Sequence, residues 1–315
     1  MTARVLVCDP IAEDGIAVLQ QFGAQVDVRT GLSPDELEAA VDSYEALIVR
    51  SETKITRQVI AAAGRLQVIG RAGIGVDNID LEAATEKGVV VVNAPTGNII
   101  SAAEHAVALM LALARHIPDA SASLKSGRWD RKRFMGLEVR GKTLGILGLG
   151  QVGSEVARRA RGLEMKVIAH DPFVPEERAR TLGVELVPFE QLLRESDFLT
   201  VHTTLSESTR RLIGEAELRE MKPTARLINT ARGGIVDEGA LDAALREDRL
   251  AGAALDVFET EPLTSHPLFS NERVVVTPHL GASTAEAQER VSQDMAEQII
   301  AVIKGEPAQY AVNAP

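Results

Sequence analysis

The sequence has 315 residues, of which 45% are hydrophobic and 25% are charged, and its formal net charge is -11 at pH 7. Such a chain is long enough for two globular domains with buried cores, and its negative charge disfavours nucleic acid as a partner because the phosphate backbone is also negative. Cys8 is the only cysteine, which excludes an internal disulfide and a cysteine-rich metal site, and no metal is expected.

The chain enters an apolar run, RVLVCD, almost at once, and this run is too short for a signal peptide. The longest apolar run, AVALMLALA at 106–114, is well below the roughly 20 residues that a membrane helix needs. We therefore expect a cytoplasmic protein that binds neither membrane nor nucleic acid.

Short runs rich in valine, isoleucine and leucine alternate with helical stretches along the chain. This pattern predicts parallel sheets covered on both faces by helices. Runs in the first third of the chain predict one small doubly wound unit, at 4–9, 25–29, 46–50, 67–71 and 89–93. Runs further along predict a second, larger unit, at 143–148, 166–171, 184–187, 198–202, 226–230, 252–257 and 274–279.

A glycine-containing turn, RAGIGVDN, follows the fourth of these runs. Its spacing is Gly73-x-Gly75-x-x-Asn78, so the third glycine of a dinucleotide-binding turn is missing and we do not assign a diphosphate there. The two glycines suggest a close approach of the backbone to a ligand or to another segment. A plain tight turn is an equally good interpretation.

Two capping boxes predict the starts of long helices. Ser101 and Glu104 open the first helix, which is apolar nearly all round up to Arg115 and should be buried between domains or subunits. Ser283 and Glu286 open the last helix, which is expected to run to about residue 305.

A complete glycine-rich turn follows the first strand of the second unit. Gly148, Gly150 and Gly153 have the spacing G-x-G-x-x-G between a strand and a helix, and the next strand ends on Asp171. The glycines allow a tight turn, close approach of a pyrophosphate and close helix packing, while the aspartate accepts hydrogen bonds from a ribose. NAD is favoured over NADP because Asp171 repels a 2′-phosphate. The alternative is a glycine turn beside a solvated aspartate.

The segment LINTARGG, at 227–234, is a buried strand that ends on an arginine and two glycines. Ligands of open α/β sheets bind at the carboxyl ends of the strands, so Arg232 is a candidate for gripping a carboxylate with its planar fork. The alternative is a surface arginine that pairs with a neighbouring carboxylate.

Two further strands of the second unit are followed by Glu261 and His279. A histidine beside a carboxylate is a general acid–base catalyst. Taken singly, Glu261 could also be a solvated turn residue, and His279 could be an ordinary loop histidine. His105 and His202 are rival histidines; we expect His105 in a packed helix and His202 near the cofactor.

The motifs GLGQVG, HDPF, LINTARGGIVDEGAL, ALDVFETEP and TPHLGAST together resemble the D-isomer-specific 2-hydroxyacid dehydrogenases, and the resemblance covers essentially the whole chain. It implies an α/β protein of two doubly wound parallel-sheet domains. A Rossmann-type NAD domain at 98–284 would be inserted in a smaller, flavodoxin-like substrate domain at 1–97 and 285–315, with the active site between them. A homodimer or tetramer is expected, with the long helix from Ser101 in its interface.

Within that family, RAGIGVDNIDLEAATEKGVVVVNAPTGN and SAAEHAVALMLALAR resemble the branch that acts on D-3-phosphoglycerate. The resemblance implies NAD-dependent oxidation of this phosphorylated 2-hydroxy acid to 3-phosphohydroxypyruvate, the first step of serine biosynthesis. Arg232 would hold the substrate carboxylate, His279 would take the hydroxyl proton, and Glu261 would hold and charge the histidine.

The resemblance also implies two sets of ligand contacts. The cofactor contacts would be Gly148, Gly150, Gln151, Val152, Gly153, Asp171, Thr203, Thr230, Ala231, Arg232, Asp256, His279, Gly281 and Ala282. The substrate contacts would be Arg50, Ser51, Gly73, Ile74, Arg232, His279 and, from a neighbouring subunit, Arg131, which lies beside Lys132 and Arg133.

Two departures from the family pattern bear on the substrate. Glu52 stands where a small residue is common and places a negative charge near the expected phosphate site. Many members carry C-terminal regulatory domains beyond the point that matches AQYAVNAP, the last residues of this sequence, so serine feedback is not assumed. The alternatives are a glyoxylate or hydroxypyruvate reductase, another D-2-hydroxyacid dehydrogenase, and an NAD-sensing, corepressor-like scaffold. A formate dehydrogenase is disfavoured because that branch resembles glutamine at the position of Glu261.

Overall fold

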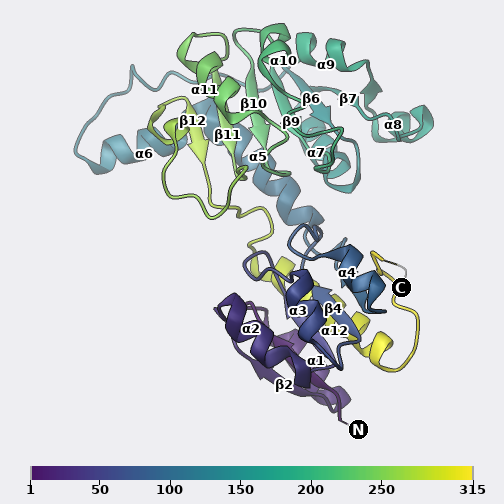
Figure 1. Cartoon of the computed structure of the whole chain (residues 1–315). Helices are drawn as coiled ribbons and strands as arrows, with labels where there is room; N and C mark the ends of the chain where they lie inside the picture. The colour runs from purple at the N-terminus through teal and green to yellow at the C-terminus, as the bar shows by residue number, and fades with distance from the viewer. Residues whose placement is uncertain (1, 314–315) are drawn as a thin grey trace. The chain divides into compact units, whose positions relative to one another are not determined.

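The computed structural model describes residues 2–313, so Met1, Ala314 and Pro315 lie outside the description. The chain forms two compact units, one of Met1–Asn98 with Ala282–Pro315 and one of Ile99–Gly281. The second unit is thus inserted in the sequence of the first (Figure 1). The division expected from the sequence was 98–284, so residues 98 and 282–284 fall in the first unit.

The first unit is built on a five-stranded sheet with the order β2-β1-β3-β4-β5 and only parallel pairs. This is the flavodoxin-like order 2-1-3-4-5 of doubly wound sheets. Alternate residues of β1 enter two different hydrophobic clusters, with Val5 in one and Leu6 in the other, so both faces are covered. The predicted strands are confirmed as β1 (Arg4–Val7), β2 (Gln25–Val28), β3 (Ala46–Val49), β4 (Val68–Arg71) and β5 (Val90–Asn93).

Helices cover both faces of this sheet (Figure 1). They are α1 (Glu13–Phe22), α2 (Pro34–Ala40), the 3-10 turn η1 (Val41–Ser43), α3 (Arg57–Ala62), α4 (Leu81–Glu86) and α12 (Ala285–Ile303).

The last helix packs against α1 and β4 at two glycines. A Cβ atom at Gly15 would lie 2.5 Å from the carbonyl oxygen of Ser292, and one at Gly70 would lie 2.3 Å from the sulfur of Met295. Thr284, not Ser283, caps this helix by accepting a hydrogen bond from the amide of Ala287. The predicted capping box is therefore wrong, because the extended backbone ends one residue later than the spacing suggests.

The second unit contains a seven-stranded parallel sheet with the order β12-β11-β10-β9-β6-β7-β8. Counted from β6, its first six strands have the Rossmann order 3-2-1-4-5-6. The predicted strands are again confirmed as β6 (Thr143–Leu147), β7 (Lys166–His170), β8 (Glu185–Leu186), β9 (Phe198–Val201), β10 (Arg226–Asn229), β11 (Gly252–Leu255) and β12 (Val274–Val276).

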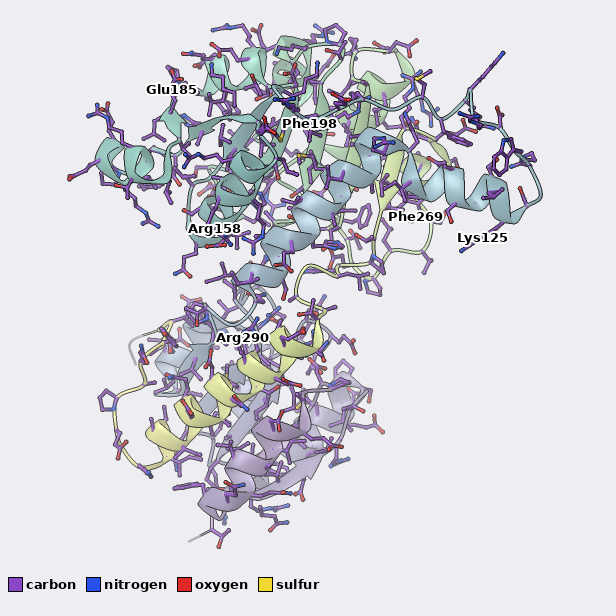
Figure 2. The ribbon with its side chains drawn as sticks, turned by 180° about the vertical axis from the view of Figure 1, so that it is seen from behind. Lys125, Arg158, Glu185, Phe198, Phe269 and Arg290 are labelled. Atoms are coloured by element: carbon purple, nitrogen blue, oxygen red, sulfur yellow. The ribbon has the colours of Figure 1, made fainter. Side chains whose placement is uncertain are left out.

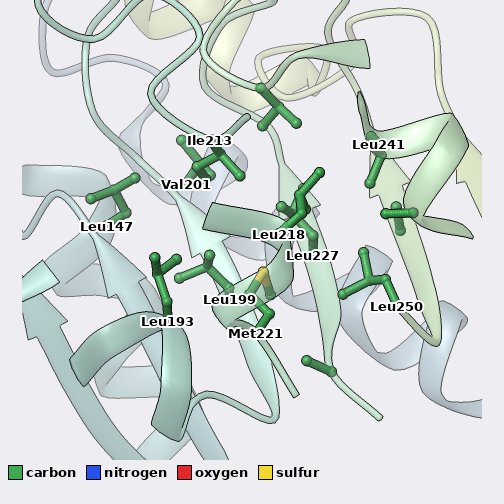
Figure 3. Packing of buried hydrophobic residues seen from close by; sticks show 14 of the residues in the cluster. Leu147, Leu193, Leu199, Val201, Ile213, Leu218, Met221, Leu227, Leu241 and Leu250 are labelled. Atoms are coloured by element: carbon green, nitrogen blue, oxygen red, sulfur yellow. The ribbon is translucent and has the colours of Figure 1, made fainter. Parts of the chain in front are cut away.

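One hydrophobic cluster lies on each face of this larger sheet. Leu199 and Leu227 belong to the first cluster, which Figure 3 shows, and Phe198 and Ile228 belong to the second. The flanking helices are α5 (Ile99–Arg115), α6 (Ile117–Lys125), α7 (Gln151–Gly162), α8 (Glu176–Leu182), α9 (Phe189–Glu195), α10 (Glu215–Glu220), α11 (Glu238–Arg246) and the 3-10 turn η2 (Pro267–Ser270).

Helix α5 packs against α7 and the sheet of its own unit (Figure 2). It begins at Ile99, so Ser101 lies inside the helix, and Glu104 pairs with Arg159 at 3.1 Å. The predicted capping box is wrong here too, because Ser101 is buried and Glu104 is held by the neighbouring helix. Within residues 2–313 no single helix meets the length and hydropathy of a membrane span; α5 and α6 do so only together, across a bend of 61°.

Replacement of Gly15 by alanine should destabilise the protein because the added methyl group meets the backbone of α12. We expect the free energy of unfolding, measured in urea, to fall by about 1–3 kcal/mol. Gly162 is the control, since a Cβ there meets nothing within 4 Å. Gly162→Ala should raise the stability by about 0.5–1 kcal/mol through helix propensity. Similar changes in both variants would contradict the close packing of α1 and α12.

Candidate active site

The glycine-rich turn between β6 and α7 leaves one open position. Gly148 has φ 94°, and a Cβ there would lie 2.8 Å from the backbone of His202 and Thr203. A Cβ at Gly153 would lie 2.1 Å from the carbonyl oxygen of Gly148. In contrast, a Cβ at Gly150 would meet nothing within 4 Å. The protein's own packing therefore demands Gly148 and Gly153, while Gly150 faces free space at a helix N-terminus, as a diphosphate requires.

Asp171 is held directly against this turn. Its Oδ2 accepts a hydrogen bond from the amide of Leu149 at 2.8 Å, and its Oδ1 accepts one from the amide of Phe173 at 2.9 Å. Carboxylate oxygens can each accept more than one hydrogen bond, so the group can also receive ribose hydroxyls. Among the described residues, the buried hydroxyl of Thr230 has no hydrogen-bond partner, which is expected of a group that a ligand satisfies.

The predicted cofactor residues of the second unit follow neighbouring parallel strands, so they share the carboxyl edge of the seven-stranded sheet. Gln151 and Val152 begin α7, and Thr203, Thr230 and Asp256 follow β9, β10 and β11. The geometry fits a bound dinucleotide. Ala282 is assigned to the other unit.

The structure brings His279 and Glu261 together. Nδ1 of His279 lies 2.6 Å from Oε2 of Glu261, while Oε1 of Glu261 accepts a hydrogen bond from the amide of Phe258 at 2.9 Å. Burial alone would raise the pKa of Glu261, but the hydrogen bonds from His279 and Phe258 lower it below its ordinary value. The carboxylate therefore stays ionised and fixes the proton of a neutral imidazole on Nδ1, which leaves Nε2 as a proton acceptor.

The turn that carries His279 is anchored on the carboxylate of Asp256. Oδ1 of Asp256 accepts hydrogen bonds from the hydroxyl of Thr277 at 2.6 Å and the amide of Leu280 at 2.7 Å, and Oδ2 accepts one from the amide of Gly281 at 2.8 Å. His279 itself has φ 54°, a left-handed conformation that costs a non-glycine residue energy unless its surroundings impose it. The buried carboxylate imposes it here.

Burial alone would raise the pKa of Asp256, but hydrogen bonds from His105, Thr277 and the amide of Leu280 lower it. His105 lies on α5, as expected, with Nε2 at 3.1 Å from Oδ1 of Asp256. Burial lowers the pKa of His202, the other rival, to about 4, and its Nε2 lies 2.8 Å from the hydroxyl of Thr200. Of the three histidines, His279 is the one paired with an accessible glutamate.

The segment after β10 explains why the arginine is followed by glycine. The side chain of Asn229 donates to the carbonyl oxygen of Arg232 at 2.9 Å and accepts from the amide of Ala231 at 3.1 Å. A Cβ at Gly233 would lie 1.9 Å from the carbonyl group of Phe258. The turn of Arg232 therefore lies backbone to backbone on the loop that carries Glu261, so all three predicted catalytic residues lie on adjoining segments.

Glu238 is a supporting residue that the sequence analysis missed. Its Oε1 accepts a hydrogen bond from the amide of Glu259 at 2.6 Å, and its Oε2 lies 3.3 Å from Nε2 of His266. Glu238 thus holds both ends of the loop that carries Glu261. Its position in the first turn of α11 is an ordinary one for an acidic residue, so only its tertiary contacts distinguish it.

In the first unit, the loop of Arg50 is held from two sides. The buried carboxylate of Asp9 accepts hydrogen bonds from the amide of Arg50 at 2.5 Å and from the amide of Thr53 at 3.2 Å. The side-chain amide of Asn78 donates to the carbonyl oxygens of Arg50 at 2.8 Å and Thr53 at 2.6 Å. Asn78, which the sequence presents as a missing glycine, is therefore a clamp for this loop.

Gly73, the first glycine of the RAGIGVDN turn, lies close to another part of the protein. Gly73 has φ 151°, and a Cβ there would lie 1.6 Å from Nη1 of Arg71. The side chain of Asn93 donates to the carbonyl oxygen of Ile74 at 2.6 Å, and the amide of Ala94 donates to that of Gly73 at 2.9 Å. The turn is thus held by the last residue of β5 and the residue that follows it.

A cavity of about 10 Å³ lies within the first unit. Arg50 and Gly73, both predicted substrate residues, line it together with residues of α12. Ser51 and Glu52 are exposed and are not among the residues that line it.

The basic segment before β6 forms an open groove in the second unit. Arg131 and Lys132 line a hollow of about 940 Å³ together with Trp129 and Met135, whose exposed fractions are 77% and 80%. Arg133 pairs with Glu272.

The chain is similar to known proteins over nearly its whole length. The family model described as "D-isomer specific 2-hydroxyacid dehydrogenase, NAD binding domain" matches residues 107–281, which confirms NAD as the cofactor. A curated D-3-phosphoglycerate dehydrogenase of Archaeoglobus fulgidus is 53% identical over 99% of this chain and 59% of its own length. This chain spans little more than half the length of the first curated relatives that it matches.

Two solved structures have the same fold over nearly all of both chains. The TT0316 protein of Thermus thermophilus has a TM-score of 0.92 and 36% identity, over 98% of this chain and 100% of that one. A glyoxylate reductase from Paecilomyes thermophila has a TM-score of 0.89 and 32% identity, over 99% and 98%. With the paired His279 and Glu261 beside the turn of Arg232, and the glycine turn on the same sheet edge, these matches lead to one conclusion: the chain belongs to the D-isomer-specific 2-hydroxyacid dehydrogenases.

Proposed function

We propose that this chain catalyses the NAD-dependent oxidation of D-3-phosphoglycerate to 3-phosphohydroxypyruvate, the first step of serine biosynthesis. The observation that carries the proposal is the hydrogen bond of 2.6 Å between His279 and Glu261 on the sheet edge that bears the dinucleotide turn. The 53% identity to a curated D-3-phosphoglycerate dehydrogenase supports this substrate.

In the proposed reaction, Nε2 of His279 takes the proton of the C2 hydroxyl. The carboxylate of Glu261 stabilises the imidazolium that forms and keeps the ring oriented. Arg232 binds the substrate carboxylate, because a guanidinium matches a carboxylate with two parallel hydrogen bonds. NAD, held by the glycine turn of Gly148, Gly150 and Gly153 and by Asp171, would supply the hydride acceptor, so that loss of the hydroxyl proton to His279 and of the C2 hydride would leave a ketone.

The remaining substrate roles are also proposals. Arg50 binds the phosphoryl group with Ser51, and the main-chain amides of Gly73 and Ile74 bind the carboxylate. Asp9 and Asn78 hold the Arg50 loop in one conformation, which supports a fixed anion-binding role because little ordering remains to be done on binding.

The proposed cofactor contacts extend the glycine turn along the same sheet edge. Asp171 binds the adenosine ribose and Thr230 offers its unpartnered hydroxyl. The full proposed set is Gly148, Gly150, Gln151, Val152, Gly153, Asp171, Thr203, Thr230, Ala231, Arg232, Asp256, His279, Gly281 and Ala282.

The active protein is proposed to be a cytoplasmic homodimer or tetramer in which Arg131 serves the neighbouring subunit's site. The exposed Trp129 and Met135 support a protein interface in this segment, since large exposed apolar side chains that gather in one place mark interaction surfaces.

A glyoxylate or hydroxypyruvate reductase is the second candidate, since a glyoxylate reductase shares 32% identity with nearly the whole chain. NADH formation with D-3-phosphoglycerate, D-glycerate and formate separates the candidates. Oxidation of D-3-phosphoglycerate with a much higher kcat/KM is the expected result. Preference for D-glycerate would favour the reductase, and NAD binding without turnover of any of the three would favour a scaffold.

Glu261→Gln tests the catalytic pair. Without the negative charge the protonated imidazole is less stable, so the rise of the oxidation rate with pH should move to lower pH. The rate itself should fall by about 100-fold or more, as for other losses in acid–base catalysis. Glu259→Gln is the matched control, because it removes the same charge from the same loop but pairs with Arg210 and Arg211. If the pH dependence of the oxidation rate were the same in Glu261→Gln as in the wild type, Glu261 would not act on the proton acceptor.

Asp171→Asn tests the basis of cofactor preference. The amide keeps one acceptor oxygen but loses the charge that repels a 2′-phosphate, so the ratio of kcat/KM for NAD to that for NADP should narrow, by about tenfold. Glu177→Gln, an exposed residue of α8, controls for the change in net charge. The same ratio in wild type and Asp171→Asn would show that the carboxylate does not set the preference.

Arg50→Ala tests recognition of the phosphoryl group. Loss of a charge-assisted hydrogen bond costs about 1.5–3 kcal/mol, so KM for D-3-phosphoglycerate should rise by about tenfold to 100-fold. Turnover of an unphosphorylated 2-hydroxy acid should hardly change. Arg65→Ala removes the same charge from an exposed position of the same unit and serves as the control. An equal fall in kcat/KM for the phosphorylated and the unphosphorylated substrate would show that Arg50 supports the fold and does not recognise the phosphoryl group.

A further inference from the structure

The cavity of the first unit has two polar side chains without partners. Its lining residues are Pro10, Ile11, Arg50, Ala72, Gly73, Ala282, Ala287, Gln288, Val291 and Ser292. Among residues 2–313, neither the guanidinium of Arg50 nor the carboxamide of Gln288 has a hydrogen-bond or ion-pair partner. The hydroxyl of Ser292, in contrast, accepts a hydrogen bond from the amide of Ala12 at 3.0 Å. Two residues whose side-chain donors have no partner among the described residues thus line one small space.

The chemistry of this lining selects an anion. None of the lining residues is acidic. The buried carboxylate of Asp9 already accepts hydrogen bonds from the amides of Arg50 and Thr53. Glu52, Glu286 and Glu289 are exposed and do not line the cavity. A guanidinium has only donors, and a carboxamide can present two N–H donors, so an oxygen with several lone pairs satisfies both.

The size of the space sets how much of a ligand enters. A cavity volume of about 10 Å³ is close to the room that one water molecule occupies by this measure. One oxygen atom of a larger group therefore fits, with the rest of the group outside. A phosphoryl group has three terminal oxygens and can place one between the two donors while the others remain available to neighbouring groups.

Both donors stand on well-supported backbone. The main chain of Arg50 is fixed by Asp9 and Asn78. Gln288 is the fourth residue of α12, and this helix packs on β4 where Gly70 meets Met295. A donor on such an element loses little backbone freedom when it binds, so its hydrogen bond contributes to affinity.

We infer that Gln288 is a specificity-determining residue, whose carboxamide donates a hydrogen bond to an oxygen of the phosphoryl group that Arg50 binds. This inference rests on the proposed function and adds a residue of the C-terminal helix to the recognition of the substrate. Gln288 takes no part in the chemical step, so it acts on KM for phosphorylated substrates and leaves kcat unchanged.

Gln288→Glu and Gln288→Met separate charge from hydrogen bonding. The glutamate has nearly the same shape but repels the phosphoryl group, so KM for D-3-phosphoglycerate should rise by about tenfold or more, the effect of losing a hydrogen bond to a charged group. The methionine removes only the donor and should raise KM by a smaller factor, about threefold to tenfold. Both variants should keep the wild-type kcat and the wild-type KM for D-glycerate.

Gln293→Glu is the matched control. Gln293 is exposed on the same helix and does not line the cavity, so the same change in charge there should leave all constants unaltered. Thermal stability of each variant, measured with NADH and increasing concentrations of inorganic phosphate, gives a readout without turnover. Phosphate should stabilise the wild type and Gln293→Glu more than Gln288→Glu.

Three results would overturn the inference. Equal rises in KM for D-3-phosphoglycerate and D-glycerate would assign Gln288 to the carboxylate or to the fold. If Gln288→Glu and Gln293→Glu raised KM for D-3-phosphoglycerate by similar factors, the cause would be the added negative charge and not a contact of Gln288. If Gln288→Glu lowered kcat and left KM unchanged, Gln288 would not take part in binding the phosphoryl group. Failure of the proposed function is visible earlier, because the wild type would then not oxidise D-3-phosphoglycerate, and the inference would fall with it.

Discussion

The geometry of the proposed catalytic centre depends on one buried carboxylate. Asp256 is fully buried, and its two oxygens accept hydrogen bonds from Thr277, Leu280 and Gly281. An ionised carboxylate is costly to bury unless such donors satisfy it, and here the donors come from the turn that carries His279. The left-handed backbone of His279 is therefore stabilised by contacts to a residue that need not itself take part in proton transfer. His105 adds a further contact from α5, which links the turn to the hydrophobic core of the second unit.

Close backbone packing complements these hydrogen bonds. At Gly233 the turn of Arg232 approaches the backbone of Phe258 so closely that no Cβ fits. The loop that contains Phe258 and Glu261 is held by Glu238, which accepts a hydrogen bond from the amide of Glu259. Glu261 of this loop contacts His279. Three segments that follow neighbouring strands β10, β11 and β12 are thereby locked to one another. Since the groups that react must be placed to within a fraction of an ångström for efficient catalysis, this packing accounts for the two glycines after the arginine.

In the first unit, too, polar side chains hold a loop by hydrogen bonds to its main chain. Asp9 and Asn78 direct their polar atoms to the main chain of the loop at 50–53, so the side chain of Arg50 is left without a partner among the described residues. Gln288 shares the cavity with it. In both units, buried polar side chains that bond to backbone groups hold the loops that carry the candidate ligand-binding residues.

The sequence by itself determined the strands, the two doubly wound units and the dinucleotide turn. Valine, isoleucine and leucine runs between helical stretches are a local signal of buried parallel strands, and a glycine turn with an acidic residue after the next strand is equally local. The tertiary structure decided what depends on contacts between distant residues. Asp9 and Arg50 are 41 residues apart, and Glu238 and Glu259 are 21 apart, so no periodicity links them.

The same reason explains the two wrong capping boxes and the contacts that the sequence left open. Ser101 and Ser283 have the spacing of capping boxes, but α5 begins at Ile99, before Ser101, and α12 begins at Ala285 with Thr284 as its N-cap. Asn78 has the sequence position of a missing glycine, but its side-chain amide holds the Arg50 loop. Which of His105, His202 and His279 lies beside a glutamate likewise depends on tertiary contacts, because residue type and position after a strand are shared by more than one of them.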